Sequence, residues 1–261
     1  MYIVSLSPDC VQKCYNKPMN DLQQAAQWLQ QAQHAVAFTG AGVSVESGIA
    51  PFTGVGGLWN QYDPQFIEIN FFLSDPARSW QEMKKIFFTD MDEAVPNKAH
   101  EVLARLEESG LLKGVITQNI DGLHQRAGSK NVQEFHGTIH TLSCLRCGRK
   151  YRLEDIDLEN IPPTCLCGSV LKPDFVFYGE GIPPRAYEKS AELAAQADVM
   201  LIVGTAGQVM PACSLPLAAK EHGCKIIEVN PRESAYTGRI TDLYFPQKAT
   251  EFFAALEKEI F

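Results

Sequence analysis

The sequence predicts an α/β protein, in which a Rossmann-like, doubly wound parallel sheet is joined by a smaller zinc-ribbon and helical module. Short apolar runs alternate with amphipathic stretches along most of the chain, which is typical of a parallel sheet covered on both faces. The first run leads into a glycine-rich segment, and two close pairs of cysteines interrupt the alternation. The chain of 261 residues is long enough for one large domain with a small satellite.

The predicted elements follow each other in a regular order. Residues 21–33 carry apolar side chains on one helical face, and Asn20 or Asp21 is placed to cap this helix. Apolar runs predict strands at residues 35–39, 114–117, 175–178, 199–203, 225–229 and, more weakly, 243–245. Helical patterns predict further helices at residues 98–109, 185–196, 212–221 and 251–260.

Two segments interrupt this order, and we assign both to the smaller module. Residues 61–93 are aromatic and helical in pattern, and residues 139–171 hold four cysteines among turn residues. The Rossmann-like NAD-binding domain then comprises residues 21–60, 94–138 and 172–261, after a tail at 1–20 that lacks periodicity. Substrate is expected in the cleft between the modules, beyond the carboxyl ends of the strands.

The composition narrows the function classes. A net charge of −8 disfavours direct contact with nucleic acid, whose phosphates it would repel. No apolar run reaches the roughly 20 residues of a membrane span, and the first residues do not resemble a signal peptide. We therefore expect a cytoplasmic protein without membrane contact, whose cysteines are metal ligands or buried thiols.

The paired cysteines predict a structural zinc site. Cys144 and Cys147 form a pair of the usual C-x-x-C kind, and Cys165 and Cys167 form a second pair that is one residue shorter. Four thiolates complete a tetrahedral site and leave no position for a reactive water. Disulfides or free thiols are the alternative. The cysteines not expected to bind zinc are Cys10, Cys14, Cys213 and Cys224.

The segment Gly40-Ala41-Gly42 follows the first apolar run, where glycines let a backbone approach a pyrophosphate. Val45 stands where the dinucleotide fingerprint has its third glycine, so a plain tight turn explains this motif equally well. The long loop that follows, rich in small residues up to Trp59, is more typical of a functional segment.

This loop, GAGVSVESGIAPFTGVGGLW, resembles the cofactor-binding segment of sirtuins of the bacterial type, which are NAD-dependent protein lysine deacylases. The resemblance covers roughly residues 21–261. Further matching segments occur in the family's order: Thr117-Gln118-Asn119-Ile120-Asp121, His136-Gly137, the paired cysteines, KPDFVFYGE at 172–180, Gly204-Thr205-Ala206 and Val229-Asn230.

The resemblance implies that NAD is a consumed co-substrate. Asp121 would hold the nicotinamide carboxamide, Asn119 would contact the ribose, and Phe52 would shield the reactive sugar face. Ala50 and Thr53 stand where the family usually has proline and arginine. The implied cofactor-binding residues are Gly40, Ala41, Gly42, Ser44, Ile49, Phe52, Thr53, Trp59, Gln118, Asn119, Ile120, Asp121, His136, Gly204, Thr205, Ala206, Asn230 and Ala249.

By the same resemblance, His136 is the catalytic base, assisted by Asn119 and Asp121. An imidazole suits the task because its ordinary pKa lets it take a proton from a ribose hydroxyl near neutral pH. Judged without the resemblance, His136 would be a structural or solvated loop histidine and Asp121 a helix cap.

The resemblance also implies that an acyl-lysine peptide pairs with an extended segment as an added strand. This segment comprises Val176, Phe177, Tyr178, Gly179 and Glu180. Met83 and Ile86 stand where succinyl- and malonyl-specific sirtuins have tyrosine and arginine. Such an apolar wall disfavours a carboxylate.

The expected reaction is therefore removal of acetyl or longer apolar acyl groups from protein lysines, giving nicotinamide, free lysine and O-acyl-ADP-ribose. Protein ADP-ribosyl transfer from the same pocket is the principal alternative. A nicotinamide oxidoreductase is less favoured, because the third glycine of the fingerprint and a clear acidic residue on the second strand are missing. A non-catalytic zinc module is less favoured, because it leaves residues 118–121 and His136 unexplained. The partners expected are acyl-lysine proteins or peptides, and we expect a monomer.

Overall fold

The computed structural model describes residues 19–52, 56–88 and 94–261. Its larger sheet is entirely parallel and has the order β3-β2-β1-β7-β8-β9. From β1 the chain continues to β2 and β3 on one side of the sheet. It then crosses to β7 on the other side of β1 and continues to β8 and β9, so the direction of the connections reverses between β1 and β7. Such a reversal opens a crevice at the carboxyl ends of the two strands. The strands are β1 (Ala35–Thr39), β2 (Leu112–Thr117), β3 (Val132–Glu134), β7 (Val199–Val203), β8 (Lys225–Val229) and β9 (Leu243–Phe245).

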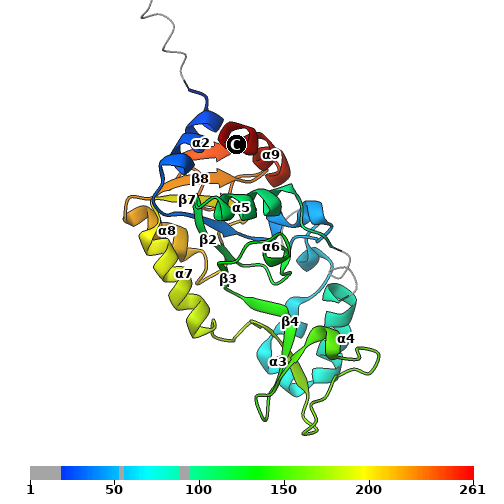
Figure 1. The fold of residues 1–261 in the computed structure, drawn as a ribbon. Helices are drawn as coiled ribbons and strands as arrows, with labels where there is room; N and C mark the ends of the chain where they lie inside the picture. Colours follow the sequence, from blue (N-terminus) through cyan, green and yellow to red (C-terminus); the bar gives the residue numbers. More distant parts are fainter. Residues whose placement is uncertain (1–18, 53–55, 89–93) are drawn as a thin grey trace, which may run out of the picture.

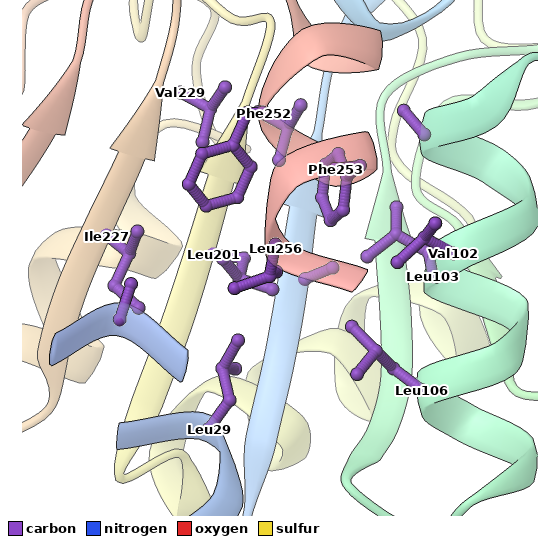
Figure 2. Packing of buried hydrophobic residues seen from close by; sticks show 14 of the residues in the cluster. Leu29, Val102, Leu103, Leu106, Leu201, Ile227, Val229, Phe252, Phe253 and Leu256 are labelled. Carbon is purple, nitrogen blue, oxygen red and sulfur yellow. The ribbon is translucent and has the colours of Figure 1, made fainter. Parts of the chain in front are cut away.

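Helices cover both faces of this sheet (Figure 1). On one face α2 (Asp21–Gln31), α5 (Lys98–Glu108) and α9 (Ala249–Ile260) pack on alternate strand residues such as Ala37 and Leu201. Figure 2 shows Phe252 and Phe253 of α9 among side chains from α2, α5 and the strands.

The opposite face is covered by α7 (Pro184–Gln196) and α8 (Ser214–Glu221), which pack on the intervening strand residues, among them Phe38 and Ile202. Because both faces are covered, all residues of β1 and β7 are buried. This explains why these strands are continuous apolar runs in the sequence.

The smaller module is a three-stranded antiparallel sheet of order β5-β4-β6, packed with two helices. Its strands are β4 (Gly137–Cys144), β5 (Lys150–Arg152) and β6 (Leu171–Phe175), and its helices are α3 (Ile69–Ser74) and α4 (Pro76–Phe87). Trp80, Phe72 and Phe177 are fully buried in its core. Figure 1 shows the module at the far end of the molecule from α2 and α9.

Most predicted elements are confirmed within two or three residues, and α2 begins at its Asn20 cap. The strand predicted at 175–178 is wrong, because the strand there is β6, which pairs with β4 in the small sheet instead of joining the parallel one. The short α6 (Leu123–Arg126) and β3 were not predicted. Short 3-10 helices lie between the longer elements: η1 (Ala41–Val43), η2 (Val45–Ser47), η3 (Leu58–Asn60), η4 (Pro64–Ile67) and η5 (Leu153–Asp155). Within the described residues, no helix is both long and apolar enough to span a bilayer.

Candidate active site

A cavity of about 680 Å³ lies where the carboxyl ends of β1, β2, β7 and β8 meet the smaller module. The large sheet supplies the loops that follow these four strands. The opposite wall comes from the segment after β6, from α4 and from the loop around Phe52. The predicted residues that line it are Gly40, Ala41, Gly42, Phe52, Trp59, Gln118, Asn119, Ile120, His136, Val176, Phe177, Tyr178, Gly179, Glu180, Gly204, Thr205, Ala206 and Asn230.

The loops after β1 and β7 touch each other at glycines. The Gly42 N–H donates to the Gly204 carbonyl at 2.8 Å. A Cβ atom built on Gly42 would lie 2.6 Å from the Gly204 Cα, and Gly204 has a φ of +63°. Side chains are therefore excluded at both positions, and close contact between two loops explains these glycines as directly as contact with a pyrophosphate.

The loop after β2 holds a buried hydrogen-bonded group formed by Asn119, Ser44 and Asp121. The Ser44 hydroxyl donates to Asp121 Oδ2 at 2.7 Å, and Asn119 Nδ2 donates to Ser44 Oγ at 3.1 Å and to Asp121 Oδ2 at 3.3 Å. Asn119 lines the cavity. Ser44 and Asp121 are hydrogen-bonded to Asn119 but do not line the cavity themselves. The structure thus brings the three predicted residues together.

His136 follows β3 and precedes β4, at the junction of the two modules. Its Nδ1 lies 3.1 Å from the Gln118 carbonyl oxygen, which can only accept a hydrogen bond. Nδ1 therefore carries the proton, and Nε2 of this cavity-lining residue has a free lone pair. Burial lowers the pKa of His136 below its ordinary value, and the Gln118 carbonyl opposes that shift.

His100 is a residue that the sequence analysis missed. Its Nδ1 accepts from the Asn97 backbone N–H at 3.3 Å, so Nε2 carries the proton toward Ser44 Oγ, 3.4 Å away. The ring therefore orients the hydroxyl that donates to Asp121. Asn97 and His100 form a capping box at the start of α5, and this Asn-x-x-His spacing before a helix was the available signal.

Phe52 lies beside Trp59 and Phe87, with ring centroids 5.4 Å and 6.4 Å away. All three rings line the cavity. Thr53, predicted as a cofactor contact, lies outside the described residues.

Besides Ser44 and Asp121, four predicted residues do not line the cavity. Met83 and Ile86 of α4 pack inside the small module's core, and Phe87 is the α4 residue that reaches the cavity wall. Ile49 packs with Leu123, and Ala249 starts α9 in the main core. Helical periodicity explains why both side chains of α4 face the core, because residues three apart share one face of a helix.

Several cavity residues were not predicted, since loops carry no periodic pattern. They include the segments 208–211 and 231–233, which follow β7 and β8. Their only signal was position, immediately after apolar strands.

The four predicted cysteines come together on the small module, with every pair of Sγ atoms within 4.8 Å. The Cys144–Cys167 and Cys147–Cys165 Sγ distances of 3.5 and 3.6 Å exclude disulfides. Among the described residues, Cys213 and Cys224 stay outside this cluster, as expected, while Cys10 and Cys14 lie outside the described part.

This donor set fits a structural zinc ion. The Cys147 N–H points to the Cys144 sulfur, and this contact is the largest cause that lowers the pKa of Cys144, to about 6. Tyr151 donates to the Cys165 sulfur at 3.1 Å. Thiolates stabilised by such donors are the ligands that zinc prefers, and four of them close its coordination sphere.

The fold and the site together define a dinucleotide-binding α/β protein with a zinc-ribbon module and a cavity-lining histidine at the junction. The model of the Sir2 family matches residues 40–211. Together with curated relatives over 40% identical across most of the chain, this match shows that the chain belongs to the Sir2 family.

Two curated relatives illustrate the similarity. The NAD-dependent protein deacylase of Aeropyrum pernix is 44% identical over 246 residues, which cover 92% of this chain and 98% of that protein. The NAD-dependent protein deacetylase of Sulfurisphaera tokodaii is 42% identical over 223 residues, covering 84% and 88%.

Solved structures of Sir2 proteins are also similar to this chain. A Sir2 protein with a deacetylated p53 peptide and 3'-O-acetyl ADP-ribose superposes with a TM-score of 0.87 at 38% identity, covering 91% of this chain and 98% of that one. A Sir2 protein bound to a propionylated peptide gives a TM-score of 0.83 at 37% identity, covering 91% and 98%.

Proposed function

We propose that this protein removes acetyl or other apolar acyl groups from lysine side chains and consumes NAD in the reaction. The observation that carries the proposal is the placement of His136. His136 lines the cavity, and its Nε2 is unprotonated. One wall of this cavity consists of loops of the dinucleotide-binding type, and the other contains an extended segment with unpaired backbone groups. The family membership and the relatives' activities support the same reaction.

NAD would lie along the loops after β1, β7 and β8. The N–H groups of Gly40, Gly42 and Gly204 already donate to backbone carbonyls. The phosphates would therefore be received by the backbone N–H groups of Ala41, Thr205 and Ala206, which line the same loops. Asn230 lines the cavity next to them and donates its Nδ2 to the Thr205 carbonyl at 2.9 Å, which fixes the side chain for a ribose contact.

The nicotinamide end would reach Asn119, which Ser44 and Asp121 hold in place. NAD supplies an electrophilic ribose carbon when its nicotinamide leaves. Asn119 orients the ribose, and Phe52 excludes water from the sugar face, since its ring closes the cavity beside Trp59. Alignment of the acyl oxygen in a closed site does most of the work, because amide oxygens are weak nucleophiles.

His136 then acts as the base. Its Nε2 accepts the proton of a ribose hydroxyl, while Nδ1 keeps its hydrogen bond to the Gln118 carbonyl and so holds the ring in one orientation. Burial favours the neutral ring, which is the form that accepts a proton.

The acyl-lysine peptide would pair with the segment after β6. The Val176 N–H is occupied by the His136 carbonyl at 2.8 Å, and the Tyr178 N–H by the Ile67 carbonyl at 2.9 Å. The Val176 carbonyl and the Gly179 N–H have no hydrogen-bond partner among the described residues. These two groups offer an acceptor and a donor to an added strand.

The acyl group would meet an apolar wall that includes Ile67, Phe87 and Ile120. The nearby lysines of α4 are engaged elsewhere: Lys84 donates to the Leu158 carbonyl and Lys85 to Glu82. Neither lysine lines the cavity, so an acyl carboxylate would lack a cation from α4.

The test is a comparison of two peptides that differ only in the acyl group. With NAD present, nicotinamide release should accompany loss of the acetyl group and should be at least tenfold slower, on the order of 1.4 kcal/mol, with the succinyl peptide. Equal rates on both peptides would contradict the apolar wall. Nicotinamide release that is unaffected by omitting the acetyl peptide would contradict the proposed reaction.

A further inference from the structure

We infer that Lys172 and Glu180 form a positioning pair that fixes the segment 176–179 in the shape that a peptide strand needs. The inference rests on the proposed function, because it concerns how this enzyme holds its acyl-lysine peptide. Neither residue touches the reacting atoms in this account; both act through the backbone between them.

Lys172 is a buried cation on β6, with only 7% of its surface exposed. Its Nζ donates to the Pro173 carbonyl at 2.9 Å, to the Phe175 carbonyl at 3.0 Å and to Glu180 Oε2 at 2.9 Å. Since an ammonium group has three N–H donors, all of them are used. The same nitrogen lies 4.1 Å from the centre of the Phe177 ring.

Glu180 completes a closed ring of contacts. Its Oε2 accepts the Phe177 N–H at 2.8 Å, and its own N–H donates to the Phe177 carbonyl at 3.0 Å. Both polar groups of Phe177 are therefore turned inward, toward the pair. The groups left unpaired on this segment, the Val176 carbonyl and the Gly179 N–H, are those that a peptide would use.

The chemistry of the pair favours a geometric role. Burial is the largest influence on Lys172 and lowers its pKa, while Glu180 raises it again. Lys172 is buried and Glu180 is partly buried, with 27% of its side chain exposed. An ion pair of this kind gains little net stability over apolar residues of similar size, because its ions lose much of their hydration. What it supplies here is direction: one nitrogen ties together two carbonyls and a carboxylate that span residues 173–180.

A positioning pair on this wall predicts a selective kinetic effect. In Lys172→Met the chain keeps an apolar side chain of similar length but loses the three donated hydrogen bonds. The KM for the acetyl peptide should rise by about tenfold or more, which corresponds to losing one or two well-placed backbone hydrogen bonds. The KM for NAD should stay within about twofold, because the NAD wall belongs to other loops.

The rescue and the control sharpen this test. Lys172→Arg keeps a cation with more than one donor and should restore most of the peptide affinity. Lys189→Met removes a lysine that is paired with Glu192 on the exposed surface of α7, and it should leave both constants unchanged. Zinc content and melting temperature should be measured for every variant.

A folded Lys172→Met protein with an unchanged peptide KM, or with equal increases for peptide and NAD, would overturn the inference. If this variant does not fold, Glu180→Gln decides, since it keeps the size of the side chain and removes only its charge. That variant should raise the peptide KM severalfold, and a wild-type value would reject the pair. Failure of the proposed function shows separately, as no NAD-dependent deacylation by the unaltered protein.

Discussion

His136 presents one ring nitrogen to the cavity because the Gln118 carbonyl occupies the other. Hydrogen bonds also fix the orientation of side chains close to His136. Ser44 is held by His100 and donates to Asp121, so a buried carboxylate has a hydroxyl in place before any ligand arrives. Fixed backbone donors and acceptors thus determine which hydrogen bonds the side chains of the site can form.

The first prediction concerns the base itself. His136→Ala should reduce deacetylation by a factor of about 100 to 10,000, the usual contribution of a positioned general base. The melting temperature and zinc content should be preserved, because the ring donates a single hydrogen bond to the protein. Turnover is followed by loss of acetyl from the peptide, and near-normal turnover in a folded variant would remove His136 from the mechanism.

The second prediction concerns pH and stability. Burial is the main cause that lowers the pKa of His100 to about 4, while the charge of Asp121 opposes it. The folded protein therefore keeps the ring neutral, whereas the unfolded chain takes a proton below its ordinary pKa of 6.5. This contribution to stability is complete above pH 6.5 and is lost progressively as the pH falls toward 4.

Replacing His100 should therefore flatten the pH dependence. Between pH 7 and pH 5, the wild type should lose about 2 kcal/mol of unfolding free energy more than His100→Asn does, from this group alone. Urea unfolding at both pH values measures the difference. Parallel curves for the two proteins would show that His100 is not buried in neutral form.

At the scale of elements, the cavity depends on loops that are anchored away from it. Glu228 of β8 is fully buried and accepts hydrogen bonds from the hydroxyls of Ser234, Thr237 and Thr241. These bonds fix the segment that follows β8, whose residues 231–233 line the cavity.

Glu228→Leu should consequently destabilise the protein by about 2–4 kcal/mol, because it leaves three partly buried hydroxyls without their acceptor. Glu228→Gln should cost less, since the amide oxygen still accepts. Denaturant unfolding gives both values, and Glu192→Leu on the exposed surface of α7 is the matched control, with an expected change within about 0.5 kcal/mol. A neutral Glu228→Leu would show that the carboxylate does not hold this segment.

The zinc module gives an element-scale prediction of its own. Cys144→Ser should lower bound zinc from about one ion per chain to almost none, since a tetrahedral thiolate site rarely survives the loss of one ligand. Cys144 ends β4, the strand that begins directly after His136, so activity should fall although no cysteine of the cluster lines the cavity. Elemental analysis measures the zinc, and Cys224→Ser, outside the cluster, should keep it.

The predictability of these elements follows their burial. The strand prediction at 199–203 is confirmed because both faces are covered and the run is continuously apolar. The prediction at 175–178 failed because the same apolar character arises in β6 and its extension, which lie against the aromatic core of the small module. Apolar content shows that a strand is buried, but it does not show in which sheet.

The residues of the site also divide into those that the sequence predicts and those that it does not. Residues at strand ends, such as Gln118 and Asn230, were predictable because their position follows from the sheet. Contacts between distant segments were not: the Lys172–Glu180 pair and the approach of Met210 to the cavity depend on loop paths that carry no repeat. Met83 and Ile86 were predicted by analogy with an acyl pocket, and the structure turns their helix face into the core.

At the scale of the whole molecule, the parallel sheet and the small module form two parts of one elongated fold (Figure 1). The parallel sheet supplies loops with backbone donors to the cavity, and the small module supplies an extended edge and an aromatic wall. His136 lies on the chain segment that joins them. In the proposed reaction, a dinucleotide and a peptide would therefore lie on opposite walls of one cavity, with His136 between them.

The most direct test of this account is mass spectrometry of the complete reaction with an acetyl-lysine peptide and NAD. The account predicts nicotinamide, deacetylated peptide and acetylated ADP-ribose in equal amounts. Acetate in place of acetylated ADP-ribose from the start of the reaction, or deacetylation that proceeds without NAD, would contradict it.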